Sequence, residues 1–157
     1  MTTLHLMVGL PCSGKTTLAK QLEIESGALR LTPDEWHRIL YGQDSTHPQH
    51  DERHEKIEAL QWEVAASALR SGLDVILDFG LWSKLERNDF KQRAATLGAA
   101  TVIHFLDVPF EELLTRLSIR NQLDPNDVTI IPTSMMSIYL SNFEEPDPDE
   151  LSSSTAM

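Results

Sequence analysis

The sequence predicts an α/β fold, a three-layer sandwich with a parallel β-sheet between helices. Short apolar runs rich in β-branched residues alternate along the 157 residues with longer stretches in which apolar residues recur at helical spacing. Strands that alternate with helices form parallel sheets, because each helix carries the chain back before the next strand begins. The predicted strands cover residues 4–8, 29–31, 73–78 and 100–106.

The first two helices have recognisable ends. The first is predicted over residues 15–25, and Gly27 stops it. The second begins at Thr32, where Thr-Pro-Asp-Glu supplies a cap residue, a proline in the first turn and a glutamate three residues after the cap. This helix is expected to extend to about Tyr41.

The remaining helices are predicted from apolar spacing and from the turn residues that flank them. They cover residues 51–70, 83–97, 109–122 and 133–143. Polar or turn-rich stretches between the elements are expected to be loops, at residues 43–50, 79–82 and 124–132.

Length and composition indicate one domain followed by a tail. A chain of 157 residues can bury one core, which we expect residues 1–143 to form. Residues 144–157 begin with five acidic residues and two prolines and carry no apolar periodicity. We therefore expect this acidic tail to be disordered.

Charge and cysteine content exclude several classes of protein. The formal net charge of −11 disfavours a nucleic-acid partner, because such binders normally present a basic face. The single cysteine, Cys12, cannot form an internal disulfide and fits a reducing compartment. No apolar run is long enough to cross a membrane, and the N-terminus lacks the basic region and cleavage site of a signal peptide. We expect a cytoplasmic protein without a membrane partner.

Residues 9–16 read Gly-Leu-Pro-Cys-Ser-Gly-Lys-Thr and match the phosphate-binding P-loop pattern G-x-x-x-x-G-K-[ST]. Glycine at both fixed positions allows successive backbone N–H groups to point into one concavity. In this motif the lysine reaches the β- and γ-phosphates, and the Thr hydroxyl binds Mg²⁺. The alternative is an ordinary glycine-rich turn. The motif predicts ATP and Mg²⁺ as cofactors, with nucleotide contacts from Gly9, Pro11, Cys12, Ser13, Gly14, Lys15, Thr16 and Thr17.

Other motifs narrow the kind of P-loop protein. The Asn-Lys-x-Asp guanine motif of small GTPases and the Ser-Gly-Gly signature of transporter ATPases are absent from the sequence. Hexameric AAA-type ATPases need a longer module with further motifs. The small-kinase class remains, with a nucleoside-kinase-like P-loop NTPase fold.

Four segments resemble a known group of enzymes: the P-loop followed by Thr-Leu-Ala, Thr-Pro-Asp-Glu-Trp, Val-Ile-Leu-Asp-Phe-Gly-Leu-Trp, and Arg-Leu-Ser-Ile-Arg-Asn. The chain resembles, over about residues 3–145, the P-loop kinases that include the zeta toxins and chloramphenicol phosphotransferase. The resemblance implies an enzyme that transfers the γ-phosphate of ATP to a hydroxyl of a small molecule. Two departures are Cys12, where many relatives have glycine, and the lack of an obvious fifth strand.

Two aspartates follow predicted strands, at the sheet edge where ligands bind in parallel α/β folds. The resemblance implies that Asp34 takes the proton of the acceptor hydroxyl; alternatively, it only stabilises the helix dipole. Asp78 ends a buried strand, where a lone carboxylate is costly unless it meets a cation or water. We expect Asp78 to hold the hydration shell of Mg²⁺ or to orient the substrate, the alternative being an acid that faces solvent.

Arginines are the remaining candidates for the chemistry. Arg116 and Arg120 lie four residues apart on one helical face, and guanidinium groups stabilise the charge of phosphoryl transfer. The resemblance implies that such arginines belong to a lid and that one of them stacks on adenine. The alternative is a solvated basic face. Arg38 follows Asp34 by one helical turn and is a candidate for binding the substrate.

Several other polar residues are expected to be structural or solvent-exposed. Weaker candidates for binding the substrate are Arg53, Lys84 and Arg87, and for all three a surface position is the favoured prediction. His47, His50 and His54 form an H-x₂-H-x₃-H pattern, in which His50 and His54 could share a helix face and bind a metal. Without a third ligand in rigid geometry, we favour a solvated loop and helix start.

Two rival functions stay open. A polynucleotide 5′-hydroxyl kinase would share the P-loop and the aspartate, although the acidic composition weighs against it. A nucleotide-binding regulatory module without catalysis would share the P-loop alone. The sequence assigns neither the acceptor nor the oligomeric state.

Overall fold

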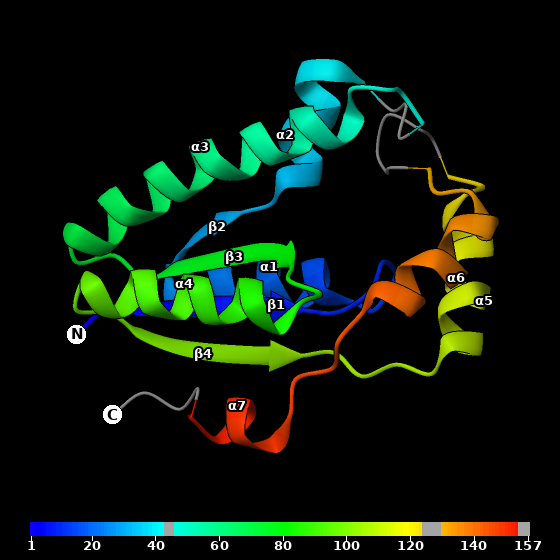
Figure 1. Cartoon of the computed structure of the whole chain (residues 1–157). Coiled ribbons are helices and arrows are strands. Elements are labelled where there is room, and N and C mark those ends of the chain that lie inside the picture. The colour runs from blue at the N-terminus through cyan, green and yellow to red at the C-terminus, as the bar shows by residue number, and fades with distance from the viewer. Residues whose placement is uncertain (43–45, 124–129, 154–157) are drawn as a thin grey trace.

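A computed structural model of the chain describes residues 1–42, 46–123 and 130–153. Parts of the predicted loops (43–45 and 124–129) and the end of the predicted tail (154–157) lie outside the described residues. Among the described residues, one sheet has the strand order β2-β3-β1-β4, and every neighbouring pair is parallel (Figure 1). The predicted α/β fold with a parallel sheet is confirmed. The strands are β1 (Thr3–Val8), β2 (Leu29–Leu31), β3 (Val75–Gly80) and β4 (Ala100–Phe105).

The predicted helices are present, with small changes at their ends. The helices are α1 (Lys15–Ser26), α2 (Pro33–Tyr41), α3 (His50–Arg70), α4 (Lys84–Thr96), α5 (Phe110–Arg120), α6 (Thr133–Asn142) and α7 (Pro148–Ser153). The position of β3 differs more from the prediction, because the strand begins and ends two residues later than expected. Gly80 pairs with Val8 of β1, so residues that we expected in a loop extend the strand.

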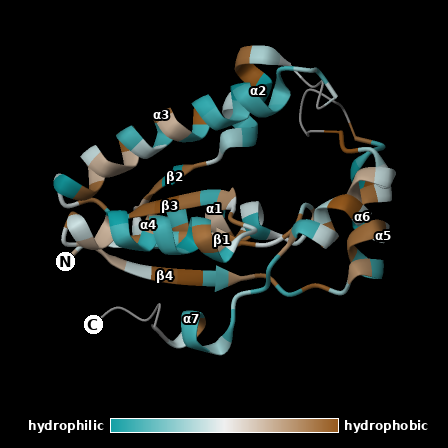
Figure 2. Cartoon of the chain, viewed as in Figure 1, coloured by the Kyte–Doolittle hydropathy of each residue, from teal (hydrophilic) through white to brown (hydrophobic). Residues whose placement is uncertain are grey.

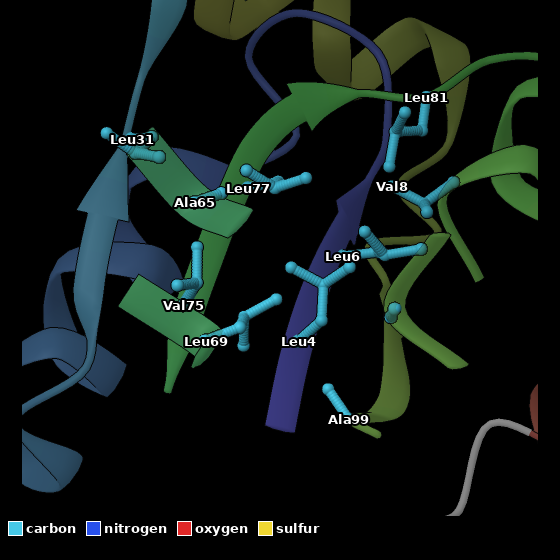
Figure 3. Close-up of a cluster of buried hydrophobic side chains, with 11 residues drawn as sticks. Leu4, Leu6, Val8, Leu31, Ala65, Leu69, Val75, Leu77, Leu81 and Ala99 are labelled. Carbon is cyan, nitrogen blue, oxygen red and sulfur yellow. The ribbon is translucent and has the colours of Figure 1, made fainter. Parts of the chain in front are cut away.

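The two faces of the sheet are covered by different helices. Leu4, Leu6 and Val8 of β1 point to one face, where they pack with Val75 and Leu77 of β3 (Figure 3). Helices α3 and α4 cover this face through buried alanines and Leu69. Alternate residues point to the other face, which α1 covers. Figure 2 shows the expected hydropathy: the strands are largely hydrophobic, and the outer helix α4 is largely hydrophilic.

Helices α5 and α6 lie beyond the carboxyl ends of the strands (Figure 1). Leu113 and Leu117 of α5 and Met136 of α6 are buried together with Leu10, which follows β1. This small apolar cluster fixes α5 against the P-loop and so determines where the arginines of α5 can reach.

The acidic tail is not disordered over its described part, contrary to the prediction. Residues Pro148–Ser153 form α7, which packs near β4. The reason is a buried ion pair: Glu150 Oε1 lies 2.8 Å from Nε of Arg87, whose side chain is only 1% exposed. The prediction that Arg87 is a surface charge is therefore also wrong. Lys84 is half-exposed, as predicted, and pairs with Asp147 at 2.7 Å.

Among the described residues, no helix combines the length and the apolar character needed to cross a membrane.

Candidate functional site

The P-loop forms a turn that is tightly packed around Gly9. The backbone N–H of Gly9 donates to the carbonyl of Gly80, and a Cβ on Gly9 would lie 2.5 Å from the Ser13 hydroxyl oxygen. Cys12 and Gly14 have φ angles of 70° and 93°, the left-handed region that glycine adopts most easily. The Ser13 hydroxyl is buried and has no hydrogen-bond partner among the described residues. A tight cradle with an unpartnered polar atom fits a phosphate-binding loop.

Asp78 lies at the centre of the polar contacts behind the P-loop. It is two residues after Ile76, so the two-residue period of the strand turns its side chain toward α1. The Thr16 hydroxyl donates to Asp78 Oδ2 over 2.6 Å, and Lys15 Nζ lies 3.3 Å from Oδ1. Asp78 is 2% exposed, so the alternative of a solvent-facing acid is wrong.

Thr32 is a member of this network that the sequence analysis missed. Its hydroxyl donates to Asp78 Oδ2 over 3.0 Å and accepts from Arg30 over 2.6 Å. Arg30 also binds Glu35 at 2.6 Å. The capping box predicted at the start of α2 therefore does not form: in the described structure the Thr32 side chain makes no capping bond. The sequence has the residue pattern of a capping box, but the Thr32 side chain binds Asp78 and the Glu35 side chain binds Arg30.

Helix α5 brings both predicted arginines to the P-loop. Arg116 donates to the carbonyl oxygen of Cys12 over 3.1 Å and to Glu112 over 2.8 Å. Arg120 donates to the Cys12 sulfur over 3.8 Å. The face that carries these arginines is therefore directed at the P-loop, although Arg116 is still partly exposed.

Two cavities meet at the P-loop. The smaller, of about 330 Å³, is lined by P-loop residues together with Arg116 and Arg120. The larger, of about 650 Å³, extends between α3, the end of β3 and α6. Lys15 and Asp34 line both cavities, so these two side chains stand where the spaces join.

The larger cavity is acidic. Its charged lining consists of one lysine, Lys15, and four carboxyl groups, those of Asp34, Asp51, Glu58 and Glu86. Burial, followed by the nearby carboxylates of Glu86 and Asp34, raises the pKa of Glu58 to about 8. Glu58 was missed by the sequence analysis, because a glutamate within a helix rich in charged residues carries no sign of burial.

The histidines are arranged differently from the prediction. His37 of α2 is 6% exposed, and its ring centroid lies 4.3 Å from that of His50. One ring nitrogen each of His37, His50 and His54 lies within 4.8 Å of the others. Burial, followed by the neighbouring His50 and His54, lowers the pKa of His37 to about 4. His47 does not belong to this group and accepts a hydrogen bond from the Gln49 backbone.

Two arginines considered as substrate-binding candidates, Arg38 and Arg53, lie outside the described linings of both cavities. Within the described part of the chain, the linings of the two cavities do not include Arg38, so its role in substrate binding stays a prediction. Arg53 lies over the ring of Tyr41, 4.4 Å from the centroid.

The P-loop, the parallel sheet and the carboxylate behind the loop define a nucleotide-binding α/β protein of the P-loop class. Residues 4–146 match the protein family described as an AAA domain, and the chain belongs to that family. No curated protein sequence matches the chain significantly.

Solved structures similar to this chain include enzymes named as kinases. A sugar kinase from Janibacter has a TM-score of 0.70 at 22% identity, covering 96% of this chain and 82% of its own. Kti12 of Chaetomium thermophilum, solved with ADP-AlF3, has a TM-score of 0.63 at 21% identity, with coverages of 93% and 82%.

A chain of the Pnkp1/Rnl/Hen1 RNA repair complex has a TM-score of 0.72 at 24% identity. The similarity covers 90% of this chain but only 43% of that one. At these identities the likenesses show a P-loop kinase-like fold. The narrower resemblance to zeta toxins and chloramphenicol phosphotransferase stays a prediction.

Proposed function

We propose that the chain is an ATP-dependent phosphotransferase that moves the γ-phosphoryl group of ATP to a hydroxyl of a small molecule. The observation that carries this proposal is the position of Lys15 and Asp34 in the linings of both cavities. A phosphoryl donor in one space and an acceptor in the other would meet at these two side chains. The volumes of the cavities are in the range of small-molecule sites, roughly 300–1,000 Å³.

The nucleotide would occupy the smaller cavity. Residues 14–17 would offer backbone N–H groups to its phosphates, and Lys15 would add a positive charge. When bound, ATP supplies the phosphoryl group and Mg²⁺ offsets its charge. Thr16 and Asp78, already in contact, are the oxygen donors that would hold the magnesium and its water.

Asp34 is the candidate general base. It lies in the first turn of α2 and lines both cavities, which suits a group that accepts the proton of an incoming hydroxyl. Arg116 and Arg120 would stabilise the negative charge that develops on the transferring group, because guanidinium donors do this without giving up a proton.

The acidic lining favours a neutral or cationic acceptor. The carboxylates of Asp34, Asp51 and Glu86 against one lysine would repel a polyanion from the larger cavity, whereas the raised pKa of Glu58 keeps that group mostly neutral at pH 7. The similarity of fold to the RNA repair complex keeps a polynucleotide 5′-hydroxyl kinase as a second candidate. It would need a basic path to the site, and the net charge of −11 argues against one.

The test is a screen of hydroxyl compounds and 5′-hydroxyl oligonucleotides with γ-labelled ATP, followed by three variants. Lys15→Ala should abolish transfer. Asp34→Asn should slow transfer by roughly 10²–10⁴-fold while leaving nucleotide affinity nearly unchanged, because a general base contributes about that much. Asp107→Asn is the matched control, since this exposed aspartate follows β4 and lies outside the described linings of both cavities.

The outcomes separate the candidates. A phosphorylated small molecule supports the proposal, and salt-sensitive labelling of an oligonucleotide supports the second candidate. Full transfer by Asp34→Asn would refute the assignment of the base. Tight ATP binding without transfer to any compound of a broad panel would favour a regulatory module without catalysis.

A further inference from the structure

We propose that His37, His50 and His54 form a zinc site with three histidine ligands in the wall of the larger cavity. The proposal rests on their arrangement and does not depend on the proposed phosphotransferase activity.

The first observation is the convergence of three imidazoles from two helices. His50 and His54 are four residues apart on α3, so they share one helix face, the spacing at which helical histidine pairs bind zinc. His37 comes from α2, which packs against α3, and supplies the third ligand in place of His47. One nitrogen of each ring lies within 4.8 Å of the others.

The second observation is a set of buried nitrogens without partners. The Nδ1 atoms of His37, His50 and His54 are all buried and have no hydrogen-bond partner among the described residues. Buried polar atoms are normally paired, and three unpaired ones at a single place call for an explanation. A metal ion bound through these Nδ1 atoms would satisfy all three at once.

The distances require only a small rearrangement. Tetrahedral zinc binds histidine nitrogen at about 2.0–2.1 Å, which places two ligand nitrogens about 3.3 Å apart. The distance between ligand nitrogens, at most 4.8 Å, would therefore have to shrink by up to about 1.5 Å, and rotation of the side chains can supply this movement.

The carboxyl group of Glu58 lies near one ligand. Glu58 Oε1 lies 3.9 Å from Nε2 of His54, the ring nitrogen opposite the unpartnered Nδ1. Histidines that bind metals usually donate their second ring N–H to such a group, which fixes the ring; at 3.9 Å the two atoms are not hydrogen-bonded and would have to move about 1 Å closer to form this bond. Asp34 and Asp51 add negative charge to the same cavity and favour a cation there.

The position of the site gives the metal access to the cavity. His50 and His54 line the larger cavity together with Asp34. Zinc with three protein ligands keeps its fourth position for water or another molecule. The fourth position would therefore be filled from the space in which we place the acceptor.

The alternative is a stack of neutral rings that packs α2 on α3. The His50 and His54 rings are stacked with an interplanar angle of 20°, which such packing also explains. Metal affinity distinguishes the two, because a packed stack has none.

The experiment is a titration of the full chain with Zn²⁺ in millimolar Mg²⁺ and without nucleotide. Magnesium prefers oxygen ligands and so occupies the hard site near Asp78 without competing for imidazole. We expect one Zn²⁺ per chain, a rise in melting temperature on binding, and the visible absorption of tetrahedral cobalt when Co²⁺ replaces zinc.

Variants locate the ion. His50→Gln and His54→Gln should each weaken Zn²⁺ binding by roughly 100-fold, since loss of a supporting residue alone costs 10–100-fold. His47→Gln, a nearby histidine outside the cluster, should bind within about 3-fold of the wild type. The two cluster variants replace half-buried residues, and circular dichroism checks that both remain folded.

Two results would overturn the proposal: no stoichiometric Zn²⁺ binding by the wild type, or binding that survives both cluster substitutions. Because the titration contains neither ATP nor an acceptor, failure of the phosphotransferase proposal would leave its result unchanged.

Discussion

Replacing Glu150 by glutamine should destabilise the whole domain, although Glu150 lies seven residues from the end of the chain. Its carboxylate holds Arg87 through two bonds, Nε–Oε1 at 2.8 Å and Nη2–Oε2 at 3.2 Å. The Arg87 guanidinium also donates to the carbonyl oxygen of Leu81 over 2.9 Å. The variant would leave a buried cation facing a neutral amide.

The size of the effect follows from this burial. Removing one partner of a buried ion pair costs about 3–5 kcal/mol, because the remaining charge is left without compensation. Glutamine keeps one acceptor oxygen, so we expect the lower end, about 3 kcal/mol. In a domain of this size each kcal/mol lowers the melting temperature by about 2–4 °C, which predicts a fall of about 6–12 °C.

The assay is thermal and urea unfolding followed by circular dichroism. Asp149→Asn is the matched control, because this neighbour in α7 is exposed and its change should stay within about 0.5 kcal/mol. Replacing both Glu150 and Arg87 by apolar residues should recover much of the loss, since no unpaired charge remains. If Glu150→Gln were no more harmful than the control, the ion pair would not anchor α7 as described.

Three further predictions concern pH, the network behind the P-loop, and the arginines. Burial alone would raise the pKa of Glu150, but hydrogen bonds from Arg87 and the Asp147 backbone hold it below the ordinary value of 4.5. The stability that this carboxylate contributes is therefore present above about pH 4.5 and lost as the pH falls through the lowered pKa. In acid unfolding curves, the stabilities of the wild type and Glu150→Gln should therefore converge. Thr32→Val should cost about 1–3 kcal/mol in urea unfolding by removing a donor to a buried carboxylate, and Thr32→Ser should restore most of it. In single-turnover assays at saturating ATP, Arg120→Gln should slow transfer by roughly 10³-fold or more; an unchanged rate would show that Arg120 does not contact the transferring group.

The parts of the site that were predictable are those encoded locally or by a rule of the fold. The P-loop has a fixed spacing between a strand and a helix, so residues 9–16 identify it directly. Parallel strands direct their carboxyl ends to one edge, which is why Asp34 and Asp78 could be expected near the P-loop from separate segments.

The parts that were missed depend on partners far away in the sequence. Arg87 and Glu150 are 63 residues apart, and an acidic segment with prolines has the composition of a disordered tail until its partner is known. The Thr32 hydroxyl goes to a carboxylate 46 residues away and not to its own helix. His37 meets the other histidines only because α2 packs against α3.

The two-residue alternation of β3 determines what a mistake in the pairing of this strand would do to the protein. Leu77 faces the apolar cluster under α3, whereas its neighbour Asp78 faces the P-loop helix. A slip of one residue in the pairing of β3 with β1 would drive the carboxylate into the apolar cluster and press a leucine against Thr16. A chain with a misplaced carboxylate would therefore fail to fold stably, and cellular quality control would remove it before it could bind nucleotide unproductively.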